Sequence, residues 1–287
     1  MTPGGAAPSA AVAAAGAGSA TRLHAQALLA AAADARLVPT LTGAPAGLSL
    51  EAAYAIADEI RRLRMARGET PRGYKIGFTN RGIWDRYGVH APIWAPVWDT
   101  TLEPLDERNE AVVSLAPFAQ PRLEPEVMFG FAAAPRAGMD ERELAGCIGW
   151  VAHGYEIVHT HFDGWRFQAA DTVADFGLHG RLFVGRRVPM GRFADPVAEL
   201  ARLTVTLTCD GRDVETGRAD IVLGGPLTAL RLWLERMAAQ PQRWPVGAGD
   251  IVSTGTITDA APMRPGQRWL TRLDDDRLPG AALRTTA

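Results

Sequence analysis

Two glutamates separated by one residue are the most chemically suggestive feature of this sequence. They lie in the stretch 120–129, whose alternation is typical of a strand and places Glu124 and Glu126 on one face. Their Cβ atoms would then lie roughly 6–7 Å apart. Carboxylates this close repel at neutral pH unless a cation or a shared proton lies between them. A hard divalent cation is the simple resolution; an exposed strand face, with the glutamates solvated or paired with Arg122, is the alternative.

The second feature is a single lysine. The chain carries 30 Lys+Arg, and Lys75 is the one lysine among them. A lysine can shift its pKa and act as a compact point charge, whereas an arginine stays protonated. The stretch 73–79 alternates as a half-buried strand, and Lys75 shares its face with Gly77 and Thr79, which leave room for a ligand. Lys75 is therefore a candidate functional cation, and a lysine left by compositional bias is the alternative.

A third carboxylate, Glu156, lies on the predicted strand 148–159 among small and apolar residues. An unpaired carboxylate would be costly there, and a bound metal would account for it. Four of the six histidines lie between positions 153 and 179. A zinc or iron site using His159 and His161 is an alternative to the carboxylate site, and hydrogen-bonded structural or surface histidines are the plainer interpretation.

Composition narrows the class of protein. The chain has 287 residues, of which 47% are hydrophobic and 22% charged, as expected for a globular protein. A net charge of -2 without a basic run gives no indication of a nucleic-acid partner. No apolar run approaches the ~18 residues that span a membrane. Cys147 and Cys209 lie in apolar, strand-like contexts, which predicts buried thiols in a reducing, cytoplasmic compartment.

Three regions are predicted along the chain. Residues 1–20 are almost wholly Ala, Gly, Pro and Ser, which indicates a disordered tail rather than a secretory signal. Residues 21–70 form a helical region, with Ser49 as the N-cap of its second helix. Residues 71–287 contain many strands and few helices, which predicts a β-rich α+β domain that holds the site.

Within the third region, the predicted strands around Lys75, the glutamate pair and Glu156 position the chemistry. A further strand at 250–256 ends in a Gly-Thr turn, and Asp210-Gly211 predicts a two-residue hairpin. The aromatic, proline-containing segment 81–99 either folds over a pocket or packs as a loop.

Five short motifs occur together in a fixed order: Tyr-Lys-Ile-Gly at 74–77, Arg-Leu-Glu-Pro-Glu at 122–126, Tyr-Glu-Ile-Val at 155–158, Asp-Thr-Val-Ala-Asp at 171–175 and Gly-Thr at 255–256. From about residue 22 to 273 the chain resembles the 2-keto-4-pentenoate hydratase / 4-oxalocrotonate decarboxylase family of the fumarylacetoacetate hydrolase superfamily. The resemblance implies a mixed β-roll of antiparallel character with an N-terminal helical region, usually assembled into homo-oligomers.

The resemblance also implies site roles. Glu124, Glu126 and Glu156 correspond to the three carboxylates that hold Mg²⁺ or Mn²⁺, Lys75 to the active-site lysine, and Thr256 to a substrate-contacting threonine. We expect Lys75 and Arg122 to bind the substrate. Asp99, Asp171 and His179 are further candidates for catalytic proton transfer. After Asp175 the chain departs from the family, because Phe176-Gly-Leu-His-Gly180 replaces an Asn followed by small, serine-rich residues.

The implied activity is that of a lyase. The first interpretation is a hydratase that adds water to a 2-hydroxy-2,4-dienoate to give a 4-hydroxy-2-oxo acid, in aromatic meta-cleavage-type catabolism. A 4-oxalocrotonate-type decarboxylase is the second, because both reactions need the same electron sink. A C–C hydrolase of acylpyruvates is the third interpretation, and a non-catalytic partner of a sister decarboxylase or hydratase is the fourth.

Overall fold

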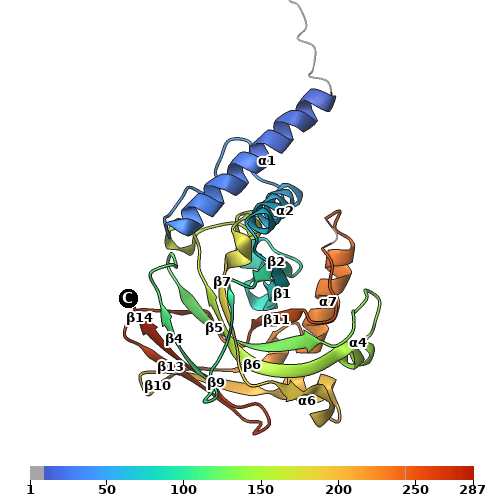
Figure 1. The fold of residues 1–287 in the computed structure, drawn as a ribbon, viewed down its shortest axis with the longest axis vertical. Coiled ribbons are helices and arrows are strands. Elements are labelled where there is room, and N and C mark those ends of the chain that lie inside the picture. The colour runs from blue at the N-terminus through green and yellow to red at the C-terminus, as the bar shows by residue number, and fades with distance from the viewer. Residues whose placement is uncertain (1–9, 243) are drawn as a thin grey trace, which may run out of the picture.

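The computed structural model describes residues 10–242 and 244–287, with side chains from residue 18 onward. Two helices, α1 (Ala10–Ala33) and α2 (Leu50–Ala66), lie at one end of a body built from curved sheets (Figure 1). Ser49 caps α2 as predicted, since its side chain accepts a hydrogen bond from the amide of Ala52.

The described part of the chain does not show the predicted disordered tail. Helix α1 begins at Ala10, inside the stretch 1–20 that we expected to be disordered, and residues 1–9 lie outside the described part. Alanine has the strongest intrinsic helix preference of all residues, so a run rich in alanine continues the helix toward the N-terminus.

Strands dominate the rest of the described chain. They are β1 (Pro71–Gly77), β2 (Ile93–Trp98), β3 (Leu102–Pro104), β4 (Glu110–Ser114), β5 (Arg122–Phe131), β6 (Ile148–Val158), β7 (His179–Val184), β8 (Val188–Pro189), β9 (Thr204–Cys209), β10 (Arg212–Arg218), β11 (Ile251–Thr256), β12 (Ala261–Pro262), β13 (Arg268–Leu273) and β14 (Ala282–Thr286). The helices among them are α3 (Trp84–Tyr87), α4 (Glu141–Cys147), α5 (Ala169–Ala174), α6 (Pro196–Arg202) and α7 (Pro226–Ala238).

The strands form two sheets. A nine-stranded sheet has the order β2-β1-β11-β5-β6-β7-β3, with β12 added to β5 and β8 added to β6. A five-stranded sheet has the order β10-β9-β13-β14-β4. Most pairs are antiparallel, but β1 runs parallel to β11, so strands distant in sequence lie side by side at the centre. The predicted β-rich α+β class is confirmed.

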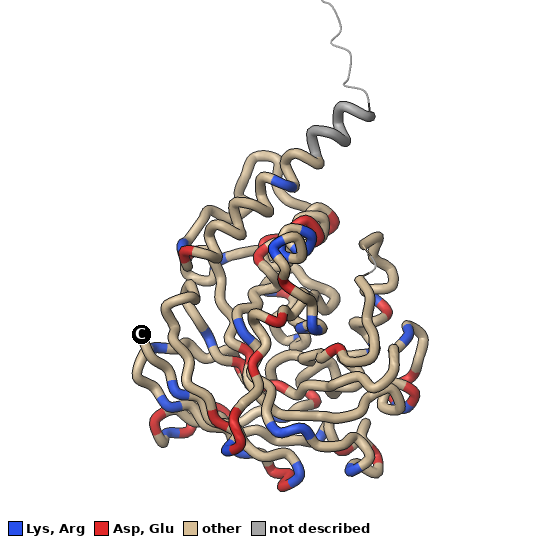
Figure 2. Tube along the Cα trace, in the orientation of Figure 1, with Lys and Arg blue, Asp and Glu red and all other residues tan. Residues whose placement is uncertain are grey.

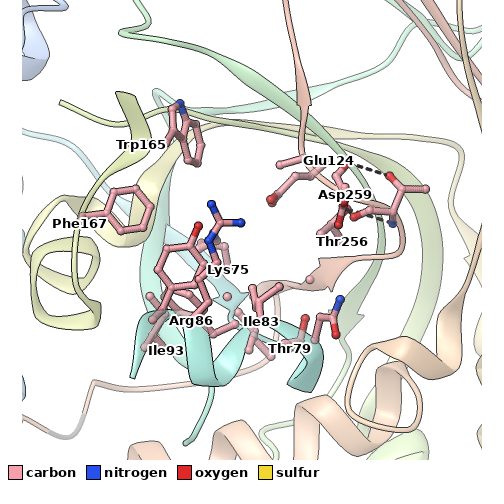
Figure 3. Close-up of a pocket in the computed structure, with 18 residues that line it drawn as sticks. Lys75, Thr79, Ile83, Arg86, Ile93, Glu124, Trp165, Phe167, Thr256 and Asp259 are labelled. Atoms are coloured by element: carbon pink, nitrogen blue, oxygen red, sulfur yellow. Dashed lines mark hydrogen bonds between the residues drawn. The ribbon is translucent and has the colours of Figure 1, made fainter. Parts of the chain in front are cut away.

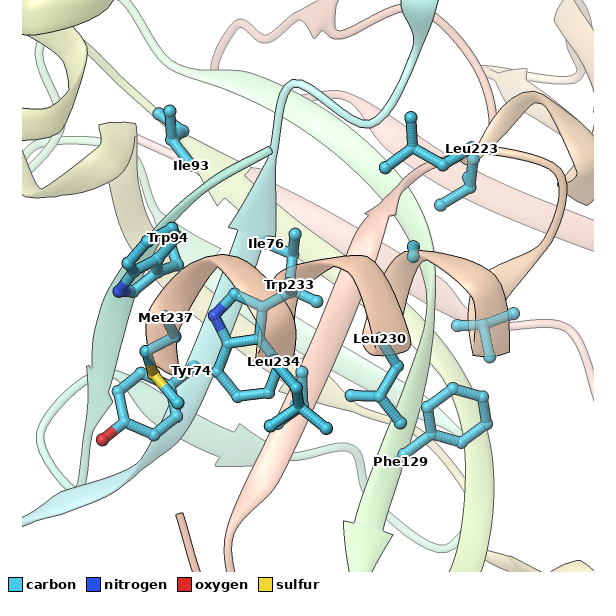
Figure 4. Close-up of a cluster of buried hydrophobic side chains, with 14 of the residues drawn as sticks. Tyr74, Ile76, Ile93, Trp94, Phe129, Leu223, Leu230, Trp233, Leu234 and Met237 are labelled. Carbon is cyan, nitrogen blue, oxygen red and sulfur yellow. The ribbon is translucent and has the colours of Figure 1, made fainter. Parts of the chain in front are cut away.

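Helix α7 covers one face of the larger sheet and fixes the central strands. Its Trp233 is fully buried and packs on Tyr74 of β1, with 5.3 Å between ring centroids (Figure 4). Phe129 of β5 lies beside Leu230 in the same cluster. Because side chains alternate along a strand, Lys75 of β1 points to the opposite face from Tyr74. Packing of α7 on one face of these strands therefore fixes the side chains that leave the opposite, polar face.

The hairpin between β9 and β10 has the predicted form. Asp210 and Gly211 both have positive φ, at 51° and 79°, as a two-residue type I′ turn requires. The pairing of Cys209 with Arg212 closes the hairpin.

In Figure 2 acidic and basic residues are interspersed along the chain, and neither sign gathers in one part of the view. Among the described residues, no helix combines the length and apolar character needed to cross a membrane.

Candidate metal centre and active site

The three predicted carboxylates converge on the polar face of β5 and β6. Glu124 and Glu156 are directly paired across the two antiparallel strands, and Glu126 follows two residues later on β5. Each glutamate offers one oxygen, and these oxygens all lie within 4.8 Å of one another. This is the geometry of ligands around one small cation.

The donor set fits a hard divalent cation. Oε1 of Glu126 is buried without a hydrogen-bond donor among the described residues, whereas Oε2 of Glu156 lies 3.3 Å from the ammonium group of Lys75. Unsatisfied carboxylate oxygens are expensive in a protein interior, and Mg²⁺ and Mn²⁺ prefer such ligands. The unpartnered oxygen of Glu126 and the close spacing of the three carboxylates together indicate that these residues are built to hold a metal.

Electrostatics point the same way. Burial, with a further contribution from the neighbouring Glu156 charge, raises the pKa of Glu124 to about 7. Burial and the charges of Glu156 and Glu124 raise the pKa of Glu126 well above its usual range. Without a cation, Glu124 and Glu126 are therefore favoured in their protonated forms, and a divalent cation would displace these protons.

Lys75 lies against this cluster. Its Nζ is 3.3 Å from Oε2 of Glu156 and donates to the carbonyl oxygen of Gly177 at 3.0 Å. Burial alone would lower the pKa of Lys75, but the carboxylates of Glu156, Glu124 and Glu126 outweigh burial and raise it. The side chain is a cation beside the glutamates, with a third N–H in addition to these two contacts.

His179 holds Glu156 from the other side. Its Nδ1 lies 2.7 Å from Oε1 of Glu156, and its Nε2 lies 2.8 Å from Oγ1 of Thr101. Burial lowers the pKa of His179, so the neutral ring donates from Nδ1 to the carboxylate and accepts from the threonine hydroxyl. His179, which the sequence suggested as a proton-transfer residue, therefore lies beside the three glutamates and contacts Glu156.

A cavity of about 230 Å³ opens onto Lys75 and Glu124 (Figure 3). Aromatic side chains form one wall, where Trp165 and Phe167 lie 6.0 Å apart between ring centroids. Arg86 points into the cavity from the segment that we expected either to cover a pocket or to pack as a loop. The structure shows the first of these outcomes.

The opposite wall carries polar groups. Thr256 lines the cavity, and its hydroxyl donates to the carbonyl of Thr258 at 2.8 Å, so the Gly-Thr turn lies where a substrate would. Asp259 lies on the same wall. Arg122 stacks on Trp165 with its guanidinium carbon 4.1 Å from the ring centroid, at the edge of the cavity. Of the three residues predicted to bind substrate, Lys75 and Thr256 line the pocket, and Arg122 lies beside its aromatic wall.

Two predicted proton-transfer residues do not reach the site. Asp99 is exposed and accepts a hydrogen bond from the amide of Thr70 at 3.0 Å. Asp171 is buried in α5, where it accepts from both the amide and the hydroxyl of Thr42 and from the amide of Gln168. These aspartates anchor loops through backbone groups, which is the common structural use of the residue type.

The alternative zinc or iron site is not formed. Among the described residues, Glu124, Glu126 and Glu156 are the group with ligand spacing. His159 accepts from the amide of Ala119, and His161 is bonded to Asp175. The contacts support the interpretation of these two histidines as hydrogen-bonded structural residues.

Sequence reasoning missed several residues of the site. Ser253 of β11 donates to Oε2 of Glu126, and the amide of Gly255 donates to the same oxygen at 3.1 Å. The cavity residue Arg86 and the carbonyl of Gly177 were also not singled out as site groups. Alternation does place Ser253 and Gly255 on one face, but only strand pairing shows that this face meets Glu126.

Comparisons with known proteins find relatives of the chain, although no family model matches it. The chain is 31% identical over 246 residues to a 4-oxalocrotonate decarboxylase of Pseudomonas sp., covering 84% of this chain and 90% of that protein. It is 29% identical to a 2-hydroxyhexa-2,4-dienoate hydratase of Comamonas testosteroni, covering 82% and 87%.

A solved structure supports the fold. The 4-oxalocrotonate decarboxylase of Pseudomonas putida G7, complexed with magnesium and adipate, superposes with a TM-score of 0.85. The match has 24% sequence identity and covers 93% of this chain and 97% of that one. The predicted β-roll with an N-terminal helical region is therefore confirmed as the fold of this chain.

Proposed function

The chain belongs to the 2-keto-4-pentenoate hydratase / 4-oxalocrotonate decarboxylase family of the fumarylacetoacetate hydrolase superfamily, and from that premise we propose that it is a hydratase dependent on Mg²⁺ or Mn²⁺. Its substrate would be a 2-hydroxy-2,4-dienoate, and its product a 4-hydroxy-2-oxo acid. The observation that carries the proposal is the convergence of three carboxylates and the single lysine beside one cavity.

Each group has a distinct task in this proposal. A divalent cation held by Glu124, Glu126 and Glu156 would supply Lewis-acid stabilisation of negative charge on the 2-oxygen of the substrate. Lys75 directs a positive charge at the same end of the cavity, where it would bind the substrate carboxylate and orient it. The hydroxyl of Thr256 lines the wall where the reacting carbons would lie.

Hydration also needs proton transfer to and from carbon and water. Lys75 can carry a proton at Nζ, since it is an amine in a buried site beside Glu156. The aromatic wall of Trp165 and Phe167 would exclude bulk water from the diene while leaving space for one reacting molecule. Decarboxylation needs a proton carrier as well, so hydration stands first because of the hydratases among the relatives of the chain.

Decarboxylation of a 4-oxalocrotonate-type 2-oxo acid is the second candidate, and one observation favours it. Arg86 points into the cavity, and its guanidinium faces the tyrosine ring of Tyr87 at 5.4 Å rather than a carboxylate in an ion pair of the described structure. A free guanidinium suits a second carboxylate at the distal end of a dicarboxylic substrate. The 31% identity to a decarboxylase agrees with this.

Product analysis distinguishes the candidates. Purified protein with Mg²⁺ would be incubated with 2-hydroxypenta-2,4-dienoate and, separately, with 2-oxohex-3-enedioate. A 4-hydroxy-2-oxo acid as the sole product supports hydration, whereas CO₂ release from the second compound supports decarboxylation. Pyruvate plus a second carboxylic acid from an acylpyruvate would instead support C–C hydrolysis and contradict both lyase assignments.

The remaining properties are part of the same proposal. We expect a homo-oligomer that can associate with a sister decarboxylase or hydratase, as in aromatic meta-cleavage-type catabolism. Cys147 and Cys209 are both free thiols, which supports a reducing, cytoplasmic compartment. Sedimentation of the full chain, alone and with a candidate partner, tests the assembly.

A further inference from the structure

The carbonyl that holds Lys75 belongs to an unusual turn. Phe176, Gly177 and Leu178 have φ values of 56°, 60° and 64°, so three successive residues are left-handed. We call these residues the 176–178 turn. Only glycine adopts this conformation freely, and a phenylalanine and a leucine lose free energy in it. A turn of this kind persists only where its surroundings hold it in place.

The position of the turn is tightly constrained. A Cβ atom added to Gly177 would lie 2.8 Å from Cβ of Ala95, on the neighbouring strand β2. The carbonyl oxygen of Gly177 accepts a hydrogen bond from Nζ of Lys75 at 3.0 Å. The turn therefore presses against β2 and presents one backbone oxygen to the buried ammonium group.

The root of the turn is tied down by a buried carboxylate. The amide of Leu178 donates to the carbonyl of Asp175 at 2.8 Å. The Asp175 side chain accepts from Thr160 Oγ1 at 3.1 Å, from the amide of His161 at 3.0 Å, and lies 2.5 Å from Nδ1 of His161. The side chains of His161 and Asp175 are both fully buried.

These contacts connect the turn to the candidate metal ligand Glu156. The segment that carries His161 directly follows β6, the strand that carries Glu156, and Lys75 contacts Glu156 and Gly177 together. His161 uses Nδ1 on Asp175, while its Nε2 is buried and has no partner among the described residues. The imidazole hydrogen-bonds Asp175, and its ring lies edge-on to Phe176 of the turn, with 6.1 Å between ring centroids.

We propose that His161 and Asp175 are positioning residues that fix the 176–178 turn and thereby hold the Lys75 ammonium beside Glu156. The pair touches neither the cavity nor the carboxylate ligands, so it acts on the reaction through Lys75. The sequence Phe-Gly-Leu-His-Gly, which departs from the family pattern, supplies the turn, and the two buried partners supply its anchor.

The single lysine allows a direct test that is independent of any activity. Protein labelled with ¹⁵N only in lysine gives one side-chain ammonium signal, from Lys75. In His161→Leu we expect the exchange of its N–H hydrogens with water to accelerate at least about fivefold, because the held state opens locally. An unchanged signal in a folded His161→Leu protein would overturn the proposal.

A milder variant and a matched control complete the test. Asp175→Asn keeps acceptors for Thr160 and the His161 amide but weakens the charged hydrogen bond, so it decides the question if His161→Leu does not fold. His159→Leu removes a histidine whose ring centroid is 4.8 Å from that of His161 and that makes no hydrogen bond to Asp175. The Lys75 signal should be unchanged in this control, and an equal acceleration there would contradict a specific role.

Turnover gives a second readout that rests on the proposed function. We expect His161→Leu to lower kcat about 10-fold to 100-fold with the metal dissociation constant unchanged, because small displacements of a reacting group are costly. In a Lys75→Met background the same substitution should have no further effect. Independent losses from the two substitutions would overturn positioning through Lys75, whereas a normal NMR response without any turnover would contradict the proposed reaction alone.

Discussion

Glu124 and Glu156 are paired residues on two adjacent antiparallel strands, so their side chains leave the sheet side by side on the same face. With Glu126 added, three negative charges meet the single positive charge of Lys75. The remaining two negative charges match one divalent cation. The pairing of these strands thus creates a site whose negative charge is balanced by a bound divalent cation or, in the metal-free protein, by protons.

The first prediction concerns Glu126. Glu126→Gln should abolish divalent-cation dependence and reduce turnover below detection, because one of the three oxygen ligands loses its charge. Calorimetric titration with Mg²⁺ and Mn²⁺ measures the loss of binding, and circular dichroism shows that the chain remains folded. Glu107→Gln, at an exposed glutamate, is the control and should bind metal normally. Full metal-dependent activity in Glu126→Gln would contradict the metal assignment.

The second prediction distinguishes the effect of Lys75 on turnover from its effect on metal binding. Lys75→Met should lower kcat by about 10²–10⁴, the range expected for a positioned proton-transfer group. Metal binding should be retained or tightened, because the ammonium at 3.3 Å from Glu156 competes with the cation for that carboxylate. Steady-state kinetics and calorimetry test both statements. A variant with normal kinetics would remove Lys75 from the site.

The third prediction follows from the raised pKa of Glu124, which is about 7 in the folded chain against 4.5 as its ordinary value. A carboxyl group with a raised pKa binds more protons in the folded state, so stability is present at low pH and is lost as pH rises through 7. The loss for metal-free protein should be up to roughly 3 kcal/mol between pH 5 and 8.

Urea unfolding of the metal-free protein across this pH range tests the third prediction. Glu124→Gln should reduce the dependence, since glutamine cannot ionise, and the remaining dependence would come from Glu126, whose pKa is also raised. Saturating Mg²⁺ should restore stability at pH 8, by about 2.7 kcal/mol at a hundredfold excess over the dissociation constant. A metal-free protein that gains stability over this range would show that the carboxylates are not held in the protonated state.

The sequence predicted those parts of the site whose residues are close together in the chain better than those whose residues are far apart. The strand alternation that pairs Glu124 with Glu126 is local, and it was sufficient to find two ligands. The position of Lys75 beside Glu156 depends on β1 lying parallel to β11, which no local pattern indicates. The fold class followed from the density of strand patterns and from the family motifs.

Some features could not be predicted from the sequence. Either the residue type disfavours the backbone conformation that it adopts, or its side chain has two common uses. Phe176 and Leu178 both adopt left-handed conformations, against the preference of their residue types, so the 176–178 turn was not expected. Asp99 and Asp171 could equally be proton carriers or backbone acceptors, and the structure shows the acceptors. Side-chain chemistry alone does not distinguish these uses.

The fourth prediction decides between the two substrate types. If Arg86 binds a distal carboxylate, Arg86→Gln should raise the KM for a dicarboxylic substrate or the inhibition constant of adipate by about 10–100-fold, the worth of one charge-assisted hydrogen bond. A monocarboxylic dienoate should be affected less than about twofold. Arg81→Gln is the control, since Arg81 lies in the same segment but stacks on Trp84 outside the cavity. Equal effects on both substrates would reject a distal carboxylate contact.

The fifth prediction concerns Ser253, whose hydroxyl donates to Oε2 of Glu126. That bond fixes the orientation of the ligand and leaves its other oxygen, Oε1, without a donor of its own. Ser253→Ala should weaken Mg²⁺ binding by about 10–100-fold, the usual effect of removing a partner that orients a metal ligand. Calorimetry measures this change, and kcat at saturating metal should recover, because all three ligands remain.

Thr254→Val is the matched control for Ser253→Ala. Thr254 is the next residue on β11, is equally buried, and donates its hydroxyl to the carbonyl of Val127 at 2.9 Å. Alternation directs it away from the carboxylates, so losing its hydroxyl should cost stability but leave metal affinity unchanged. If both variants bound Mg²⁺ equally weakly, the effect would come from a loosened strand. Weakening in Ser253→Ala alone would show that the serine acts through the orientation of Glu126.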